Sequence, residues 1–362
     1  MTTTQPLKLA ISGGDGIGPE VVAEGLKVLA ALESADLVRT EQSVFDAGGE
    51  RYLRTGEALP DSMLEELRAF DAIYFGAIGR PDIPPGIMGP KFLFKVRWGF
   101  QQFANVRPVK LYPGVVSPIR DLTPESCDFV VIRENTEGLY AGTGGTMRSG
   151  TAQEIATQES INTRFGVERV LRYAFDAARA RKGRLTLIHK ANVLVHAGGL
   201  WTRTFAELGE QYPDVERDYV HVDAACLYFV TQPERFDVVV TENLFGDILT
   251  DLGAAMQGGM GLAASGNIDP TRTGPSMFEP VHGSAPDIVG TGRADPVAAV
   301  MSLGMLLTFV GATQAGDRVD QAIAAYLVER GDRRPDGRDL TTSDVGDRLA
   351  ELALEVGSSH PS

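Results

Sequence analysis

FDVVVTENLFGDILTDL, residues 236–252, is the stretch that decides how the rest of the sequence is interpreted. Its first part, residues 236–241, is apolar and β-branched, which predicts a strand buried in a parallel sheet. Residues 242–246 contain Asn and Gly and predict a short turn. A helical period resumes at Asp247, so this residue is predicted to be the N-cap or to lie in the first turn of a helix.

Asp247 and Asp251 are four residues apart, so a helix would carry both carboxylates on one face, one turn from each other. Two unpaired neighbouring carboxylates repel, and a hard cation such as Mg²⁺ or Mn²⁺ would remove that conflict. Taken alone, the pair also fits an acidic helix start that the helix dipole favours. The choice between these interpretations depends on partners elsewhere in the chain.

The composition indicates a soluble globular protein. Its 362 residues are too many for one ordinary core and predict two domains. The net charge of −14 argues against nucleic acid and membranes as partners but allows an anionic substrate bound by local arginines. Cys127 and Cys226 form no metal or disulfide pattern and fit reduced thiols of a cytoplasmic protein. Neither a signal peptide nor a membrane-spanning segment is expected.

Strands and helices are expected to alternate along the chain. The glycine-rich turn at residues 13–18 lacks the GxGxxG spacing of a Rossmann dinucleotide site. Residues 140–149 suggest a hairpin or arm, residues 265–267 a loop, and the chain after residue 330 a polar tail. The other expected strands are 7–12, 72–75, 128–132, 185–189 and 219–222, and the expected helices are 19–32, 61–69, 91–103, 166–182, 247–252, 296–309 and 319–330.

Charged residues gather where four of these strands end. Arg133, Lys190 and Asp223 each follow such a strand, and so does the turn that leads to Asp247. One charged residue after a strand is ordinary, but four of complementary types are not easily explained as solvated loop ends. Because α/β sheets place ligands at the carboxyl ends of their strands, these residues predict a ligand site.

With these residues in view, the sequence resembles the β-decarboxylating dehydrogenases of 2-hydroxy acids. That family includes the 3-isopropylmalate, isocitrate, homoisocitrate and tartrate/D-malate dehydrogenases. The resemblance extends from residue 14 to about residue 311. It is carried by GDGIGPE at 14–20, Arg97, NVRP at 105–108, RENTEG at 133–138, KAN at 190–192, Asp223, NLFGDILTDL at 243–252 and EPVHGSAPD at 279–287.

The resemblance implies an α/β, isopropylmalate/isocitrate dehydrogenase-like fold that has two lobes and is not a Rossmann fold. A discontinuous large domain, residues 1–105 plus 259–362, would bind the cofactor. Residues 106–258 would form the small domain with the dimer interface. The family also implies a homodimer with shared active sites, in which Lys190 and Asp223 come from the neighbouring chain.

The implied reaction is the NAD-dependent, metal-assisted oxidative decarboxylation of a hydroxy-dicarboxylate. Guanidinium forks would bind the substrate carboxylates in bidentate fashion. Lys190 would take the hydroxyl proton, and Tyr140 would protonate the enol carbon. The implied substrate-binding arginines are Arg97, Arg107 and Arg133. The implied ligands of Mg²⁺ or Mn²⁺ are Asp223, Asp247 and Asp251.

The resemblance also places the cofactor. The adenosine site would be lined by His282, Gly283, Ser284 and Ala285. Asp287 and Asp295 would meet the adenosine ribose. A carboxylate there accepts a hydrogen bond from a 2′-hydroxyl and repels a 2′-phosphate, so NAD is expected rather than NADP.

Leu93 and Phe94 lie on the same helix face as Arg97 and are expected to contact the side group of the substrate. Their apolar surface disfavours the third carboxylate of isocitrate. Isopropylmalate enzymes usually carry leucines and a glutamate here, whereas this chain has the larger Phe94 and no glutamate in residues 89–94. We therefore expect 3-isopropylmalate or a related 3-alkylmalate, with tartrate/D-malate and homoisocitrate as alternatives.

An alternative of another class is a noncatalytic regulatory subunit that binds metal and acids. Such a subunit would be expected to lose catalytic residues, whereas Lys190, Tyr140 and the three aspartates are all present.

Overall fold

The computed structural model describes residues 5–330 and 340–356, and within them ten strands form one large sheet. The strand order is β2-β1-β3-β12-β11-β4-β5-β10-β8-β9. The strands are β1 (Leu7–Gly14), β2 (Thr40–Val44), β3 (Ala72–Ala77), β4 (Ala104–Lys110), β5 (Asp128–Glu134), β8 (Arg184–His189), β9 (Glu216–His221), β10 (Val238–Thr241), β11 (Ala264–Ile268) and β12 (Ser276–Pro280). A separate antiparallel hairpin, β6 (Gly144–Met147) and β7 (Ile155–Gln158), forms the expected arm.

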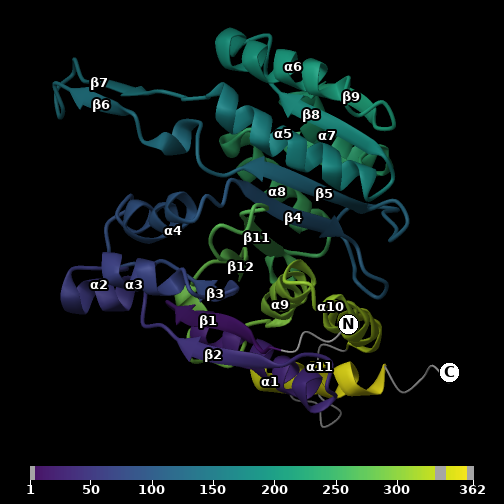
Figure 1. The fold of residues 1–362 in the computed structure, drawn as a ribbon. Helices are drawn as coiled ribbons and strands as arrows, with labels where there is room; N and C mark the ends of the chain where they lie inside the picture. The colour runs from purple at the N-terminus through teal and green to yellow at the C-terminus, as the bar shows by residue number, and fades with distance from the viewer. Residues whose placement is uncertain (1–4, 331–339, 357–362) are drawn as a thin grey trace.

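Helices complete the α/β fold that the sequence predicts. They are α1 (Gly18–Ser34), α2 (Gly49–Thr55), α3 (Asp61–Leu67), α4 (Phe94–Gly99), α5 (Arg164–Arg179), α6 (Val195–Gly209), α7 (Val222–Thr231), α8 (Asn243–Met256), α9 (Val297–Phe309), α10 (Thr313–Glu329) and α11 (Thr342–Glu355). Figure 1 shows the middle of the chain, in teal and green, at one end of the molecule and both chain ends, in purple and yellow, at the other. Where the boundary between two lobes lies stays a prediction.

Strand β10 is buried on both faces, as its continuous apolar sequence predicts. Val238 and Val240 pack in one core cluster with residues of α5 and α6. Val239, which points to the opposite face, packs in a second cluster with residues of α7 and α8. Strands β5, β10, β8 and β9 are mutually parallel, so their carboxyl ends lie at the same edge of the sheet.

The start of α8 corrects one prediction. The helix begins at Asn243, within the predicted turn, and Glu242 is its N-cap, whose side chain accepts a hydrogen bond from Phe245 N. Asp247 is therefore neither the N-cap nor a first-turn residue. A glutamate supplies the capping oxygen here, although shorter polar side chains are the usual N-caps. The four-residue spacing of Asp247 and Asp251 still places both on one face of the helix.

Three further predictions are wrong in part. Residues 265–267, expected to form a loop, lie in β11. The polar side chains of Ser265 and Asn267 fit within the sheet because they are hydrogen-bonded to residues of other strands. The chain after residue 330, expected to be a polar tail, contains α11. This helix begins with a capping box formed by Thr341 and Asp344. Residues 331–339 and 357–362 of the expected tail lie outside the described residues. The helix expected at 91–103 is a π-helical turn, Gly89–Leu93, followed by α4, which ends at Gly99.

Both cysteines are free thiols, Cys127 buried and Cys226 partly buried. The cytoplasmic location inferred from them stays a prediction. Across residues 5–330 and 340–356, we find no helix with the length and apolar character that crossing a bilayer requires.

His189, the last residue of β8, has no exposed surface. Its ring lies 5.9 Å from that of Trp201 and 5.6 Å from that of Phe245. Neither ring nitrogen has a hydrogen-bond partner among the described residues. Burial lowers the pKa of His189 from 6.5 to about 4, because a charged imidazolium would lose its hydration without gaining a partner.

We therefore predict that His189 makes the protein sensitive to acid. Between pH 6.5 and pH 4 the unfolded chain binds a proton at this residue and the folded chain does not, so stability falls as the pH falls. The loss attributable to His189 is on the order of 3 kcal/mol. Denaturant unfolding of the wild type and of His189→Leu should give curves that diverge over this range, with the variant less pH-dependent. Parallel curves would contradict the prediction.

Candidate active site

One cleft is lined by all of the predicted substrate-binding residues. It has a volume of ≈ 350 Å³ and is lined from β3, α4, β4, β5, α8, β11, β12 and the turns next to them. The predicted site residues that line it are Leu93, Phe94, Arg97, Arg107, Arg133, Tyr140, Asp247 and Gly283. Predicted residues as far apart in the sequence as Leu93 and Gly283 therefore line one cleft.

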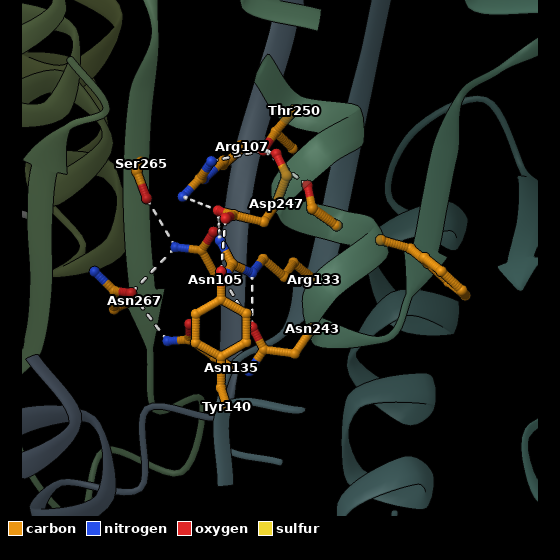
Figure 2. Close-up of polar contacts among 12 residues, drawn as sticks. Asn105, Arg107, Arg133, Asn135, Tyr140, Asn243, Asp247, Thr250, Ser265 and Asn267 are labelled. Carbon is orange, nitrogen blue, oxygen red and sulfur yellow. Dashed lines mark hydrogen bonds and ion pairs between the residues drawn. The ribbon is translucent and has the colours of Figure 1, made fainter. Parts of the chain in front are cut away.

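Three buried arginines give the cleft its charge. Arg133 donates from Nε and Nη2 to Asn243 Oδ1 at 2.9 and 2.7 Å, and its Nη1 pairs with Asp247. Arg107 donates from Nη1 to Thr250 Oγ1 at 2.6 Å, and its Nη2 lies 3.8 Å from Asp247 Oδ1. Figure 2 shows both guanidinium groups pointing toward Asp247.

The sequence of α8 allows this close approach. A Cβ at position 246 would lie 2.6 Å from Arg133 Cγ, so only glycine fits beside the arginine side chain. Burial, together with the charge of Arg133, lowers the pKa of Arg107 to about 10. Burial likewise lowers the pKa of Arg97. Clustered, desolvated cations of this kind are stabilised by anions, which is what a dicarboxylate would bring.

Tyr140 and Asp247 form a pair beside the arginines. The Tyr140 hydroxyl donates to Asp247 Oδ2 at 2.6 Å, and the Arg133 guanidinium lies 5.0 Å from the centre of its ring. Burial and the hydrogen bond to a carboxylate raise the pKa of Tyr140, so the phenol keeps its proton at neutral pH. Burial opposes ionisation of Asp247, but Arg133, Tyr140 and Arg107 outweigh it and hold the pKa of that carboxyl below its usual range.

Asp247 and Asp251 are two of the three predicted metal ligands, and both lie on α8. Partial desolvation and the neighbouring charge of Asp247 raise the pKa of Asp251, which is the conflict that a divalent cation would relieve. The third predicted ligand, Asp223, does not join this pair within one chain. Among the residues described, no group of three or more His, Cys, Asp or Glu is placed to hold a metal ion.

Lys190 and Asp223 are paired with each other instead. Lys190 Nζ lies 2.6 Å from Asp223 Oδ1, and this hydrogen bond lowers the pKa of Asp223. Lys190 follows β8 and Asp223 lies in the first turn of α7, so both stand at the predicted edge of the sheet. Neither residue lines the ≈ 350 Å³ cleft.

The residues predicted for cofactor binding lie beside the glycine-rich turn at residues 13–18. Ile17 N donates to Ser284 O at 2.9 Å, and a Cβ at Gly16, whose φ is +61°, would lie 2.0 Å from that oxygen. His282 Nε2 is buried and has no hydrogen-bond partner among the described residues. Gly16 therefore allows the turn to pack on the Ser284 carbonyl, and the unsatisfied buried nitrogen of His282 fits a group that a bound nucleotide would supply. The next residue of the predicted set, Ala285, has a left-handed φ of +38°.

The two predicted ribose carboxylates differ. Asp287 is exposed in a short 3₁₀ turn, Pro286–Ile288. Asp295 has partners within the chain: it accepts a hydrogen bond from Val297 N at the start of α9 and pairs with Arg330 Nη2 at 2.7 Å. Asp287 is therefore the more accessible of the two carboxylates.

Several cleft residues were missed by the sequence analysis. Glu279 and Ser265 line the cleft, as do the apolar Ile78 and Val281. Glu279 opens the EPVHGSAPD motif, which could have drawn attention to it, whereas Ser265 was assigned to a loop. A larger cavity of ≈ 560 Å³, lined mainly from β4, α9 and α10, contains no residue predicted for the site, so the polar chemistry identifies the smaller cleft.

Comparisons with known proteins identify the family of the chain. The family model described as isocitrate/isopropylmalate dehydrogenase matches residues 8–349. The chain is 53% identical over 356 residues to the 3-isopropylmalate dehydrogenase of Thermobifida fusca, covering 98% of this chain and 100% of that one. It is 56% identical over 344 residues to the 3-isopropylmalate dehydrogenase of Mycobacterium avium, covering 95% of this chain and 99% of that one.

A solved structure of an isocitrate dehydrogenase has the same fold. The isocitrate dehydrogenase of Methylococcus capsulatus superposes with a TM-score of 0.86 at 36% identity, covering 96% of this chain and 99% of that one. The family match over nearly the whole chain, the two relatives and this structure confirm the predicted resemblance. The chain therefore belongs to the isocitrate/isopropylmalate dehydrogenase family and is an oxidoreductase.

Proposed function

We propose that this enzyme catalyses the NAD-dependent, metal-assisted oxidative decarboxylation of 3-isopropylmalate or a related 3-alkylmalate. The observation that carries the proposal is a single cleft in which three buried guanidinium groups and the Tyr140–Asp247 pair lie beside apolar side chains. The relatives from Thermobifida fusca and Mycobacterium avium, both named 3-isopropylmalate dehydrogenase, favour the same substrate.

The apolar part of the cleft favours an alkyl side group. Leu93 and Phe94 line it together with Ile78 and Val281. A third carboxylate, as in isocitrate, would lose its hydration against these side chains. The Phe94 ring is a fixed part of this wall, because it packs on Gly89 and lies 5.4 Å from the Trp98 ring and 6.0 Å from the Tyr140 ring.

In this reaction, side chains of the enzyme bind the substrate and transfer protons. Arg97, Arg107 and Arg133 bind and orient the substrate carboxylates. Tyr140, protonated at neutral pH, donates a proton to the substrate carbon that loses its carboxylate. Lys190 accepts the proton of the substrate hydroxyl. When bound, NAD supplies a hydride acceptor and Mg²⁺ or Mn²⁺ supplies Lewis-acid stabilisation of the developing negative charge.

A second copy of the chain is proposed to complete the site. Exposed apolar side chains stand on the elements that carry the predicted catalytic and metal residues: Val193 and Val195 after Lys190, Leu227 one turn after Asp223, and Ile248 beside Asp247. Each of these four side chains is more than half exposed, at 64%, 63%, 59% and 54%. Exposed apolar side chains next to these residues support the proposal that a second copy of the chain covers them. A homodimer that covers it would bring Lys190 and Asp223 of one chain to the cleft of the other.

The metal and cofactor proposals rest on the residues already described. Asp247 and Asp251 would hold Mg²⁺ or Mn²⁺ together with Asp223 of the second copy. Residues 282–285 would hold the adenosine of NAD, and the exposed carboxylate of Asp287 favours NAD over NADP.

The experiment that tests the function is a side-by-side assay of 3-isopropylmalate, tartrate, D-malate, isocitrate and homoisocitrate, with Mn²⁺ and either NAD or NADP. We predict that 3-isopropylmalate with NAD gives the highest kcat/KM. Phe94→Leu should raise kcat/KM for 3-isopropylmalate about threefold to tenfold, because it removes a rigid wall from the alkyl pocket. Rates led by tartrate, D-malate or homoisocitrate would contradict the substrate assignment.

Shared active sites predict complementation between inactive variants. Lys190→Ala and Arg97→Ala should each be inactive alone. In a heterodimer of the two, one site combines an intact Arg97 with an intact Lys190, so random mixing by joint refolding should restore about a quarter of wild-type activity. Each variant refolded alone is the control. If Lys190 and Arg97 acted within the same chain, mixing would restore no activity.

The proposed metal ligands predict a direct change in metal affinity. Asp251→Asn removes one carboxylate charge and should weaken Mn²⁺ binding, measured by calorimetry, at least about tenfold. Asp121→Asn, at an exposed carboxyl that does not line the cleft, is the matched control and should bind Mn²⁺ as the wild type does. Equal Mn²⁺ affinity of Asp251→Asn and the wild type would rule out Asp251 as a ligand.

A further inference from the structure

Asn267 lies in β11, and its side chain is hydrogen-bonded to Asn105 and Asn135 on one side and to Glu279 on the other. It has no exposed surface. Its Oδ1 accepts hydrogen bonds from Asn135 Nδ2 at 2.9 Å and from Asn105 Nδ2 at 3.1 Å. Figure 2 shows the three amides next to one another, with Ser265 hydrogen-bonded to Asn105. The carbonyl end of the Asn267 amide is thus fixed by two donors from the β4 and β5 region.

The other end of the same amide holds an acidic side chain of the cleft. Asn267 Nδ2 donates to Glu279 Oε1 at 2.8 Å. If the amide were flipped, its NH₂ group would face the donors of Asn105 and Asn135, and its oxygen would face the Glu279 carboxylate. The network therefore allows one orientation, in which Asn267 always offers a donor to Glu279.

Glu279 is close to Arg97 but does not form a hydrogen bond with it. Glu279 Oε1 lies 3.7 Å from Arg97 Nη2, and the two side chains are only 13% and 7% exposed. A buried carboxylate and guanidinium that are free to move usually close to about 2.7–2.9 Å. The oxygen nearest to Arg97 is the one that Asn267 binds, so the hydrogen bond from Asn267 opposes this closure.

We propose that Asn267 is a positioning residue that keeps Glu279 from closing an ion pair with Arg97. The guanidinium of Arg97 then stays available to a carboxylate of the substrate. This inference rests on the proposed function only in taking a malate-type carboxylate as the ligand of Arg97. A closed Arg97–Glu279 pair would compete with the substrate, so the restraint acts on substrate binding more than on the chemical step.

Asn267→Leu tests the restraint, because it removes the donor at nearly constant volume. In its crystal structure, the Arg97–Glu279 separation should contract from 3.7 Å into the hydrogen-bonding range. The KM of the substrate should rise about tenfold while kcat changes less than about twofold. Adding Glu279→Gln to Asn267→Leu removes the competing charge and should lower KM again. Gln257→Leu, the matched control, removes a buried amide that contacts neither Asn267 nor Glu279 and should keep both the separation and the KM.

A second variant covers the case in which Asn267→Leu does not fold. Asn267→Ala removes the donor to Glu279 without adding a larger side chain to the strand, so the same contraction and the same rise in KM are expected. An unchanged Arg97–Glu279 separation in the variant, or an equal rise in KM for Gln257→Leu, would overturn the proposal. If the wild-type enzyme oxidises none of the malates, the proposed function fails, and the separation still decides the role of Asn267.

Discussion

The burial of three guanidinium groups beside the carboxylates of Asp247 and Glu279 is the interaction on which the site depends. Arg133 pairs directly with Asp247, and Arg107 lies 3.8 Å from the same carboxylate. Removing several cations from water is costly unless anions accompany them. Asp247 provides one such anion and Glu279 lies near Arg97, which leaves a cationic cleft that a dicarboxylate can enter. The same field keeps Asp247 ionised and therefore able to hold the proton of Tyr140 in place.

The sheet brings these groups together from distant parts of the chain. Arg107 and Arg133 lie on the antiparallel neighbours β4 and β5, and α8 follows β10, which pairs with β5 in parallel. Gly246 allows α8 to pack against the Arg133 side chain. The amide of Asn267 connects β11 to this group and to Glu279, so the position of the cleft wall is coupled to the strands that carry the arginines.

Much of this arrangement could be predicted from the sequence, because it depends on short-range patterns. The apolar run of β10 and the spacing of Asp247 and Asp251 were sufficient to predict the α/β class and the helix that carries both aspartates. The arginines of the cleft were expected from the family resemblance of short motifs, and Glu279 and Ser265 were not expected there. The start of α8 was misplaced because Glu242 is an unusual N-cap. The residues of β11 were assigned to a loop because their polarity is satisfied only by partners on other strands, which no local pattern reveals.

In the proposed homodimer, residues of both chains form each metal site. A crystal structure of the enzyme grown with Mn²⁺, with anomalous scattering recorded for manganese, tests this arrangement most directly. We predict that each site holds one manganese bound to Asp247 and Asp251 of one chain and to Asp223 of the other. Manganese bound elsewhere, or Asp223 still paired with Lys190 of its own chain and distant from both Asp247–Asp251 pairs, would contradict it.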